Sequence, residues 1–343
     1  MPRIFDCFLF FNELDLLELR LNELSDVVDF FVLAEATVTH RGVPKPLIFR
    51  QNRDRFAPFL NRIIHVVVDD MPGCGPSEPE RWRRENFQRQ ALLRGLSGAR
   101  TRDYVIISDL DEIPHPSAIE NVARKREIIP TRYAFEMRMF YYYLNLECCE
   151  GWTMAAMGRR ANVIDVNQFR LFGKPWITPR SQPKRLAKTI KYFGTPMRWR
   201  VVPNGGWHFT FMNGPEAVRE KLFHYSHVSP DEEITLDHLR ARMSDAINAP
   251  GFQVRQLDER FPSYLRRNPG RFSHLLVGIA LKLPLGSVQG RGRSGHAMAS
   301  TAAAGRGHLQ RQRCTLSPSR MSPRAGEPYN RNKPHASCHL PQN

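Results

Sequence analysis

The chain has 343 residues, of which 41% are hydrophobic and 10% are aromatic. This apolar content excludes a wholly disordered chain, and the length fits one large α/β domain or two smaller ones. The net charge is +16, and residues 286–343 contribute half of it through nine Lys/Arg and one acid. The remaining body is therefore mildly basic, which is compatible with a phosphate-bearing ligand.

The first part of the sequence predicts an open parallel sheet. Residues 4–11 form a continuous apolar run of strand length, and leucines recur at three- and four-residue steps across residues 14–24. The first pattern is typical of a buried strand and the second of an amphipathic helix. Residues 27–34 predict a second strand, so the chain begins with a β-α-β unit.

Further strands and helices are expected to alternate after this unit. Residues 62–68 predict a third strand, residues 69–80 a Pro/Gly-rich loop and residues 81–96 a helix. A fourth strand is expected at residues 104–108, and Pro116 suits the first turn of another helix. This alternation favours the α/β class.

The second half is expected to be richer in strands. Residues 134–144 and 199–203 predict strands, and residues 215–224 and 236–243 predict helices. Residues 272–285 are apolar but shorter than a membrane span, so we expect a buried or interfacial segment there.

Apolar periodicity stops near residue 285. We interpret residues 1–285 as the folded domain and residues 286–343 as a disordered, low-complexity basic tail. No segment reaches the roughly 18–20 apolar residues of a transmembrane helix, and residues 4–11 lack the flanks of a signal peptide. We therefore expect a cytoplasmic protein without a transmembrane segment, whose membrane contact is at most peripheral.

Two carboxylates, Asp109 and Asp111, follow the fourth predicted strand. In an extended chain, residues two apart point to the same side, so both side chains can face one ligand. A hard divalent cation prefers such oxygen ligands, and open α/β sheets bind ligands beyond the carboxyl ends of their strands. The alternative is a solvated turn that caps the next helix, because acid-x-acid spacing also arises by chance.

Several segments, in chain order, resemble glycosyltransferase family 17. The matching stretches are FNELDLLELRLNEL (residues 11–24), VVDFFVLAEATVTHRGVPKPLIF (27–49), YVIISDLDEIP (104–114), AFEMRMFYYYL (134–144), GGWHFTF (205–211) and, more weakly, YLRRNPGRFSHLL (264–276). The resemblance implies a GT-A-like open, mainly parallel sheet with flanking helices. In that fold, about residues 1–130 would bind the nucleotide sugar and about residues 131–285 the acceptor.

The same resemblance implies an activity. It is the inverting transfer of GlcNAc from a UDP-GlcNAc donor to a glycan or glycoprotein acceptor, as in N-glycan processing, with Mn²⁺ or Mg²⁺ as the divalent metal. Animal members of the family are Golgi membrane proteins with an N-terminal anchor, whereas this chain begins at its first predicted strand. Residues 147–198 diverge from the family, so the acceptor stays open.

The resemblance also suggests metal ligands. Asp111 is expected to coordinate the metal directly, and Asp109 to contact the metal, a bound water or the donor ribose. A later histidine often completes such sites, and His208 in the GGWHF segment is the candidate, because flanking glycines let the backbone approach a ligand closely. The alternative for His208 is a packed histidine beside an aromatic wall.

Two further residues are candidates for donor binding. Glu35 ends the second predicted strand, where it could meet the uridine or ribose hydroxyls or could be a plain surface acid. Arg89 could pair a phosphate bidentately, or could form an ion pair with Glu85 one helical turn away.

Inversion by single displacement requires a carboxylate that deprotonates the acceptor hydroxyl. Glu216, just after the GGWHF segment, is our candidate base, although an acid there also suits a helix start. Glu112 and Asp165 are the alternatives.

Two other functions are also compatible with the sequence. The basic tail could indicate a nucleic-acid-binding protein, but no recognition motif accompanies it, so we expect no specific nucleic-acid partner. A catalytically inactive relative that only binds sugars is the second alternative.

Overall fold

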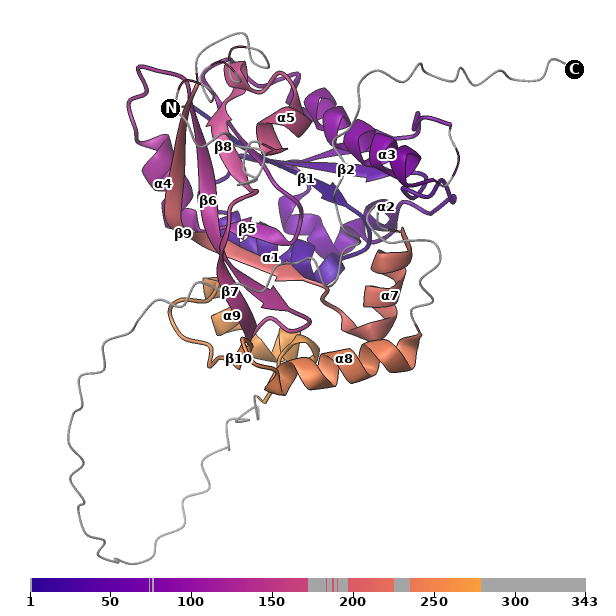
Figure 1. The fold of residues 1–343 in the computed structure, drawn as a ribbon. Coiled ribbons are helices and arrows are strands. Elements are labelled where there is room, and N and C mark those ends of the chain that lie inside the picture. Colours follow the sequence, from indigo (N-terminus) through magenta and orange to yellow (C-terminus); the bar gives the residue numbers. More distant parts are fainter. Residues whose placement is uncertain are drawn as a thin grey trace, which may run out of the picture.

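The structure of the chain is a computed structural model. It describes residues 2–73, 75, 77–171, 183, 187, 190, 197–224 and 235–278. Within these residues a ten-stranded mixed sheet is flanked by helices on both faces (Figure 1).

The N-terminal strands form a parallel sheet, as the sequence predicts. They are β1 (Ile4–Phe10), β2 (Phe30–Ala36), β3 (Ile63–Val68) and β4 (Tyr104–Ile107). They lie side by side in the order β3-β2-β1-β4. Helices cover both faces, so the central strands β1 and β4 are almost entirely buried and, apart from Asp6 in β1, consist of apolar residues.

The helices associated with this sheet have the following bounds. They are α1 (Leu14–Leu24), α2 (Ile48–Gln51), the 3₁₀ helix η1 (Arg53–Phe59), α3 (Glu78–Ala91), the 3₁₀ helix η2 (Leu92–Leu96), α4 (Pro116–Ala123), the 3₁₀ helix η3 (Arg160–Asn162) and α5 (Val166–Leu171). Helix α3 starts with a capping box, in which Ser77 and Glu80 satisfy each other's backbone amides.

Alternate residues of β1 contact different helices. Phe8 and Phe10 pack in the core cluster that contains the leucines of α1 and the apolar residues of α4. Phe5 and Cys7 pack in the cluster on the opposite face, which contains residues of η2 and α5. Asp6 shares the face of Phe8, because side chains alternate along a strand, and it therefore points toward α1.

The remaining strands make the sheet mixed. They are β5 (Glu112–Pro114), β6 (Thr131–Tyr141), β7 (Leu146–Trp152), β8 (Ala156–Arg159), β9 (Arg198–Thr210) and β10 (Gln253–Val254). Strand β8 is antiparallel to both β4 and β6, and so connects the parallel part to the rest. Strand β9 runs parallel to β6 and also pairs antiparallel with the short β5.

The C-terminal helices pack against the sheet at two places. Their bounds are α7 (Gly214–His224), α8 (Leu236–Asn248), α9 (Ser263–Arg267) and the 3₁₀ helix η4 (Pro269–Leu275). Helices α7 and α8 lie together at one end of the molecule, where they share a separate apolar cluster with β6 and β7 (Figure 1). Buried residues of α9 and η4 join the core cluster of α1.

The α/β class is confirmed, but parallel pairing dominates only among β1–β4. The expected strand at residues 199–203 is the first part of the longer β9, and the helix expected from residue 81 begins at Glu78. Strands β5, β7 and β8 and helix α5 were not predicted.

The C-terminal expectations fall partly outside the described residues. Phe272 and Leu275 of η4 are buried, as expected for the apolar segment that begins at residue 272. The rest of that segment after residue 278, and the expected tail at residues 286–343, lie outside the described residues. In the part of the chain that is described, no helix is long and apolar enough to cross a membrane.

Candidate active site

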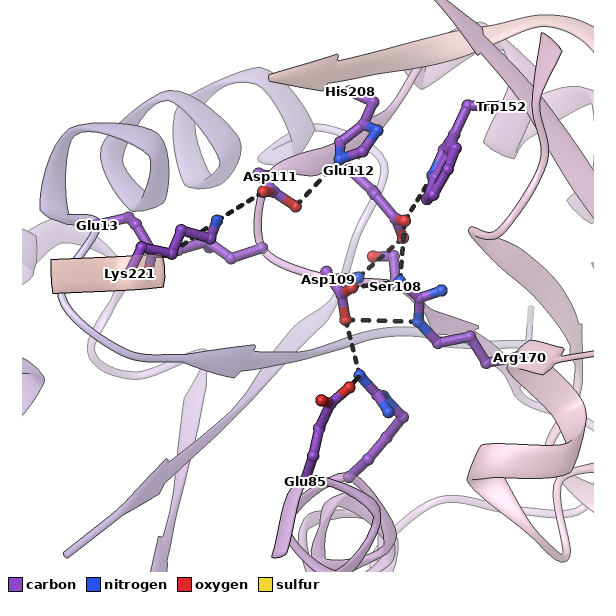
Figure 2. A network of polar contacts seen from close by, with 12 residues as sticks. Glu13, Glu85, Ser108, Asp109, Asp111, Glu112, Trp152, Arg170, His208 and Lys221 are labelled. Atoms are coloured by element: carbon purple, nitrogen blue, oxygen red, sulfur yellow. Dashed lines mark hydrogen bonds and ion pairs between the residues drawn. The ribbon is translucent and has the colours of Figure 1, made fainter. Parts of the chain in front are cut away.

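The two aspartates lie in a short turn between β4 and β5, at the edge where the parallel strands end. The amide of Asp109 donates to Oε2 of Glu112 at 2.9 Å, and the amide of Glu112 donates to the carbonyl of Asp109 at 3.0 Å. Because the chain turns here, the side chains of Asp109 and Asp111 point toward different partners (Figure 2). The extended-chain expectation that both carboxylates face one ligand therefore does not hold in this structure.

Asp109 lies between two arginines from helices on the same face of the sheet. Oδ1 accepts a hydrogen bond from Arg89 of α3 at 3.2 Å, and Oδ2 accepts one from Arg170 of α5. Burial acts to raise the pKa of Asp109, but the charges of Arg170 and Arg89 outweigh it and hold the pKa well below its usual range. Asp109 is therefore ionised at neutral pH.

Glu112 is the most enclosed acid of the turn, with 0% of its surface exposed. Its Oε1 accepts hydrogen bonds from the indole of Trp152 at 2.6 Å and from Arg170 at 2.9 Å. Burial raises the pKa of Glu112 above its ordinary value, Arg170 opposes that shift, and nearby Asp109 adds to it. Arg170 thus binds two carboxylates and connects α5 to the turn.

Asp111 contacts a different set of side chains. Its Oδ2 lies 2.9 Å from Nζ of Lys221 in α7, and the same ammonium lies 3.2 Å from Oε1 of Glu13 at the start of α1. Its Oδ1 lies 3.7 Å from Nε2 of His208, which is too far for a hydrogen bond. Figure 2 shows Asp111 between Lys221 and His208.

His208 reaches the turn through the pairing of β9 with β5, in which it lies directly opposite Glu112. The approach depends on Gly206, whose φ is +145° and at which a Cβ atom would lie 2.2 Å from the carbonyl oxygen of Ile113. The His208 ring packs on Trp152 with 4.7 Å between ring centroids. Within the described residues, its buried Nδ1 has no hydrogen-bond partner.

These residues fit a divalent cation in part. Two donors at right angles on one ion, each about 2.1 Å away, are about 3 Å apart. The 3.7 Å between Asp111 and His208 is close to that separation. Within the described ranges, no group of three or more His, Cys, Asp or Glu side chains is arranged to hold a metal ion. Among the predicted ligands in the described part of the chain, Asp111 and His208 are therefore spaced so that they could share one ion.

The structure brings four of the predicted site residues together, namely Arg89, Asp109, Asp111 and His208. Arg89 forms the ion pair with Glu85 at 2.8 Å that helical spacing predicts, and its guanidinium also lies 3.2 Å from Asp109. The pairing expected from helical spacing therefore coexists with a contact at the site. Phosphate binding by Arg89 stays a prediction.

Glu35 and Glu216 lie in other surroundings. Glu35 is 0% exposed, and its oxygens bind His65 at 3.0 Å and the amide of Phe49 at 3.1 Å. Glu216 is exposed on α7 and forms an ion pair with Arg240 of α8 at 2.8 Å. Neither carboxylate has a described contact with the turn from Ser108 to Glu112, which we call the acidic turn. Both assignments therefore stay predictions.

Several residues of the site were not predicted from the sequence as site residues. They are Glu13, Arg170 and Lys221. Arg170 lies in a helix of six residues without a periodic pattern, and Lys221 follows a run of ordinary helix-surface residues. The only available sequence signal was that both are cations in a chain whose predicted ligand is anionic.

The comparisons with known proteins agree with the resemblance. Residues 1–165 match the sequence model of glycosyltransferase family 17. The mouse and human proteins named beta-1,4-mannosyl-glycoprotein 4-beta-N-acetylglucosaminyltransferase are each 28% identical to this chain over 228 residues. The match covers 62% of this chain, 40% of the mouse protein and 41% of the human one, so the chain matches about two fifths of these relatives' length.

Solved structures with some likeness have low scores. The inositol-1-phosphate CTP transferase of T. maritima has 9% identity and a TM-score of 0.30, over 60% of this chain and 87% of that chain. Glucosyl-3-phosphoglycerate synthase of M. tuberculosis has 12% identity and a TM-score of 0.29, over 78% of this chain and 92% of that chain. The sequence matches, rather than these structures, confirm that the N-terminal half of the chain resembles glycosyltransferase family 17.

Proposed function

We propose that this chain is a metal-dependent, inverting glycosyltransferase that transfers GlcNAc from UDP-GlcNAc to a glycan acceptor. The observation that supports this most is the meeting of Asp109 and Asp111 with three cationic side chains at the carboxyl edge of the parallel strands. Open α/β sheets bind nucleotides at this edge. The names of the curated relatives support GlcNAc as the transferred sugar.

The cations suit a diphosphate leaving group. Arg89, Arg170 and Lys221 come from three different helices and all point at the acidic turn. In the proposed donor complex, their charges would neutralise the negative charge that develops on the leaving diphosphate. Asp109 holds both guanidinium groups in place, so that less rearrangement is needed when the donor binds.

Asp111 and His208 are the proposed protein ligands of a divalent cation, with Asp109 at the same edge. When bound, such an ion would act as a Lewis acid toward the diphosphate. Asp111 is already paired with Lys221, so the ammonium would have to move for Asp111 to bind another cation. Mn²⁺ and Mg²⁺ both accept oxygen ligands, and Mn²⁺ tolerates imidazole more readily.

The acceptor hydroxyl requires a base, and Glu216 remains our candidate. Its carboxylate is exposed, and its described ion pair is with Arg240. An acceptor that bound between α7 and the acidic turn could displace this exposed pair, because such pairs contribute little stability. Glu216→Gln should then lower the rate of transfer while the affinity for UDP stays unchanged.

Calorimetric titration with UDP tests the donor site. The wild-type protein should bind UDP in the presence of Mn²⁺, and a chelator should weaken that binding. Asp111→Ala should abolish the Mn²⁺-dependent part and leave the fold intact. Asp70→Ala is the matched control, because Asp70 is an exposed aspartate paired with Arg94 away from the acidic turn. Unchanged UDP affinity in Asp111→Ala would refute the proposed site.

Turnover separates the enzyme from an inactive sugar-binding relative. Release of UDP from UDP-GlcNAc is measured with a panel of glycan acceptors. It is expected to exceed the release of UDP from other UDP-sugars and the release of GDP from GDP-sugars. Tight UDP binding without release in the presence of any acceptor would instead favour the inactive relative. The acceptor identified in this way would define the linkage.

A further inference from the structure

Arg20 is a charged residue in the middle of α1 that is completely buried, with 0% of its surface exposed. Its guanidinium binds both carboxylate oxygens of Asp6 in β1, at 2.7 and 2.6 Å, and stacks on the ring of Phe8. Asp6 is also 0% exposed, so the pair is shielded from water and from salt. A buried ion pair is costly to form, so its other contacts indicate what it does.

The remaining hydrogen bonds of Arg20 all go to the acidic turn. Nη1 donates to the carbonyl oxygens of Asp109 at 2.9 Å, Leu110 at 3.0 Å and Glu112 at 2.8 Å. Nη2 donates to the hydroxyl of Ser108 at 2.6 Å. One side chain therefore contacts the turn at four of its residues.

This arrangement explains the shape of the turn. Three carbonyl oxygens that converge on one point repel each other, and a cation at that point removes the repulsion. With these carbonyls turned inward to Arg20, the side chains of Asp109 and Asp111 are directed outward to their separate partners. Asp6 fixes the orientation of the guanidinium, because a planar guanidinium that binds both oxygens of one carboxylate cannot rotate freely.

We propose that Arg20, held by Asp6, is the positioning residue that sets the backbone of the turn from Ser108 to Glu112 and thereby the directions of the site carboxylates. Its role is exerted through the loop, since Arg20 is enclosed and contacts no ligand position. The structural part of this inference is independent of the proposed function, and only its ligand-binding readout rests on it.

Three variants test the proposal. Arg20→Lys keeps the charge beside Asp6 but replaces the guanidinium, which has five N–H donors, with one ammonium group. The ammonium cannot bind Asp6 and also reach all four residues of the turn. Asp6→Asn combined with Arg20→Met removes both charges, which avoids leaving one buried carboxylate unpaired. Arg62→Met is the matched control, because Arg62 also donates to three carbonyl oxygens, those of Ser25, Val28 and Asp29 at the turn between α1 and β2.

Hydrogen exchange of backbone amides reports on the turn without any ligand. Both Arg20 variants should speed exchange of the Asp109 and Glu112 amides by about tenfold or more, because each amide bonds within the turn that Arg20 holds. Amides of β2 should keep their wild-type rates. Arg62→Met should leave the acidic turn unaffected and speed exchange near residues 25–29.

Binding of UDP with Mn²⁺ provides the second readout. Both Arg20 variants should lose about tenfold or more in affinity, and Arg62→Met should bind as the wild type does. Wild-type exchange at the turn in either folded variant would overturn the proposal. General loss of protection, in β2 as well as in the turn, would also overturn it by assigning Arg20 to overall stability. If the wild type itself bound no UDP, the proposed function would fail, and the exchange experiment would still decide the role of Arg20.

Discussion

Nζ of Lys221 lies 2.9 Å from Oδ2 of Asp111, so a helix from the C-terminal part of the chain places a cation on the carboxylate that the sequence assigns to a metal. The ammonium competes with any divalent ion for the same oxygen. Because Lys221 is held by Glu13 as well, the competition involves the start of α1 and not only the acidic turn.

Replacing this lysine should therefore strengthen metal binding in the absence of nucleotide. Lys221→Met removes the competing charge and its repulsion of the ion, and we expect the affinity for Mn²⁺ alone to rise by about tenfold. Electron paramagnetic resonance of free Mn²⁺ measures this directly. Lys125→Met, a change at an exposed lysine in another part of the chain, is the control. Weaker Mn²⁺ binding in Lys221→Met would show that the lysine supports the site rather than competing for it.

Removing Arg170 should destabilise the fold as well as the site. Arg170→Met removes the ion-pair partner of the buried Glu112 carboxylate and leaves it the indole of Trp152 and the amide of Asp109 as hydrogen-bond donors. This loss should cost about 3 kcal/mol in the free energy of unfolding at pH 7. Chemical denaturation measures this loss. The difference in the free energy of unfolding between Arg170→Met and the wild type should become smaller at lower pH, because Glu112 can then take up a proton. Arg94→Met, which breaks an exposed pair with Asp70, should change stability by no more than about 1 kcal/mol. Equal losses in the two variants would contradict the role given to Arg170.

The ion pairs of Asp109 predict a specific dependence on pH. The folded-state pKa of Asp109 lies below its unfolded value, so its contribution is present above about pH 4 and is lost as the pH falls further. Asp109→Asn should lower the free energy of unfolding by about 1.5–3 kcal/mol at pH 7. The difference between variant and wild type should narrow below about pH 4, in thermal unfolding followed by circular dichroism. A difference that stayed constant down to pH 3 would argue against a charge effect.

The contacts of Glu35 favour a structural role over the donor-binding role that the sequence suggests. Its oxygens bind His65 and the amide of Phe49, and Lys45 lies 3.5 Å away. From these contacts we expect Glu35→Gln to lower the free energy of unfolding by about 1–3 kcal/mol and to leave UDP affinity unchanged. The two quantities are measured by denaturation and by calorimetry. The opposite pattern, weaker UDP binding at wild-type stability, would support the donor-binding assignment made from the sequence.

The sequence predicts the local features of this protein well, because they depend on neighbouring residues. The apolar residues of β1 and β4 follow from burial on both faces of the sheet, and the leucines of α1 follow from packing in the core cluster. Asp109 and Asp111 stood out because they directly follow such a run. These features required no knowledge of distant contacts.

The partners of the aspartates could not be predicted in the same way. Arg170 is 61 residues from Asp109 and Lys221 is 110 residues from Asp111 in sequence. Nothing local distinguishes either cation from the other basic residues of the chain. The shape of the turn cannot be predicted from local sequence for a related reason, since Arg20, which binds its carbonyl oxygens, lies in a helix far from it in sequence.

The site also depends on a position that has no side chain. At Gly206 even one added carbon atom would collide with the backbone of β5, as its 2.2 Å approach to the carbonyl oxygen of Ile113 shows. Such a collision would push the two strands apart and carry the imidazole of His208 away from Asp111. The reach of the histidine is therefore limited by how closely two backbones can meet, and no choice of residue at position 208 could restore it.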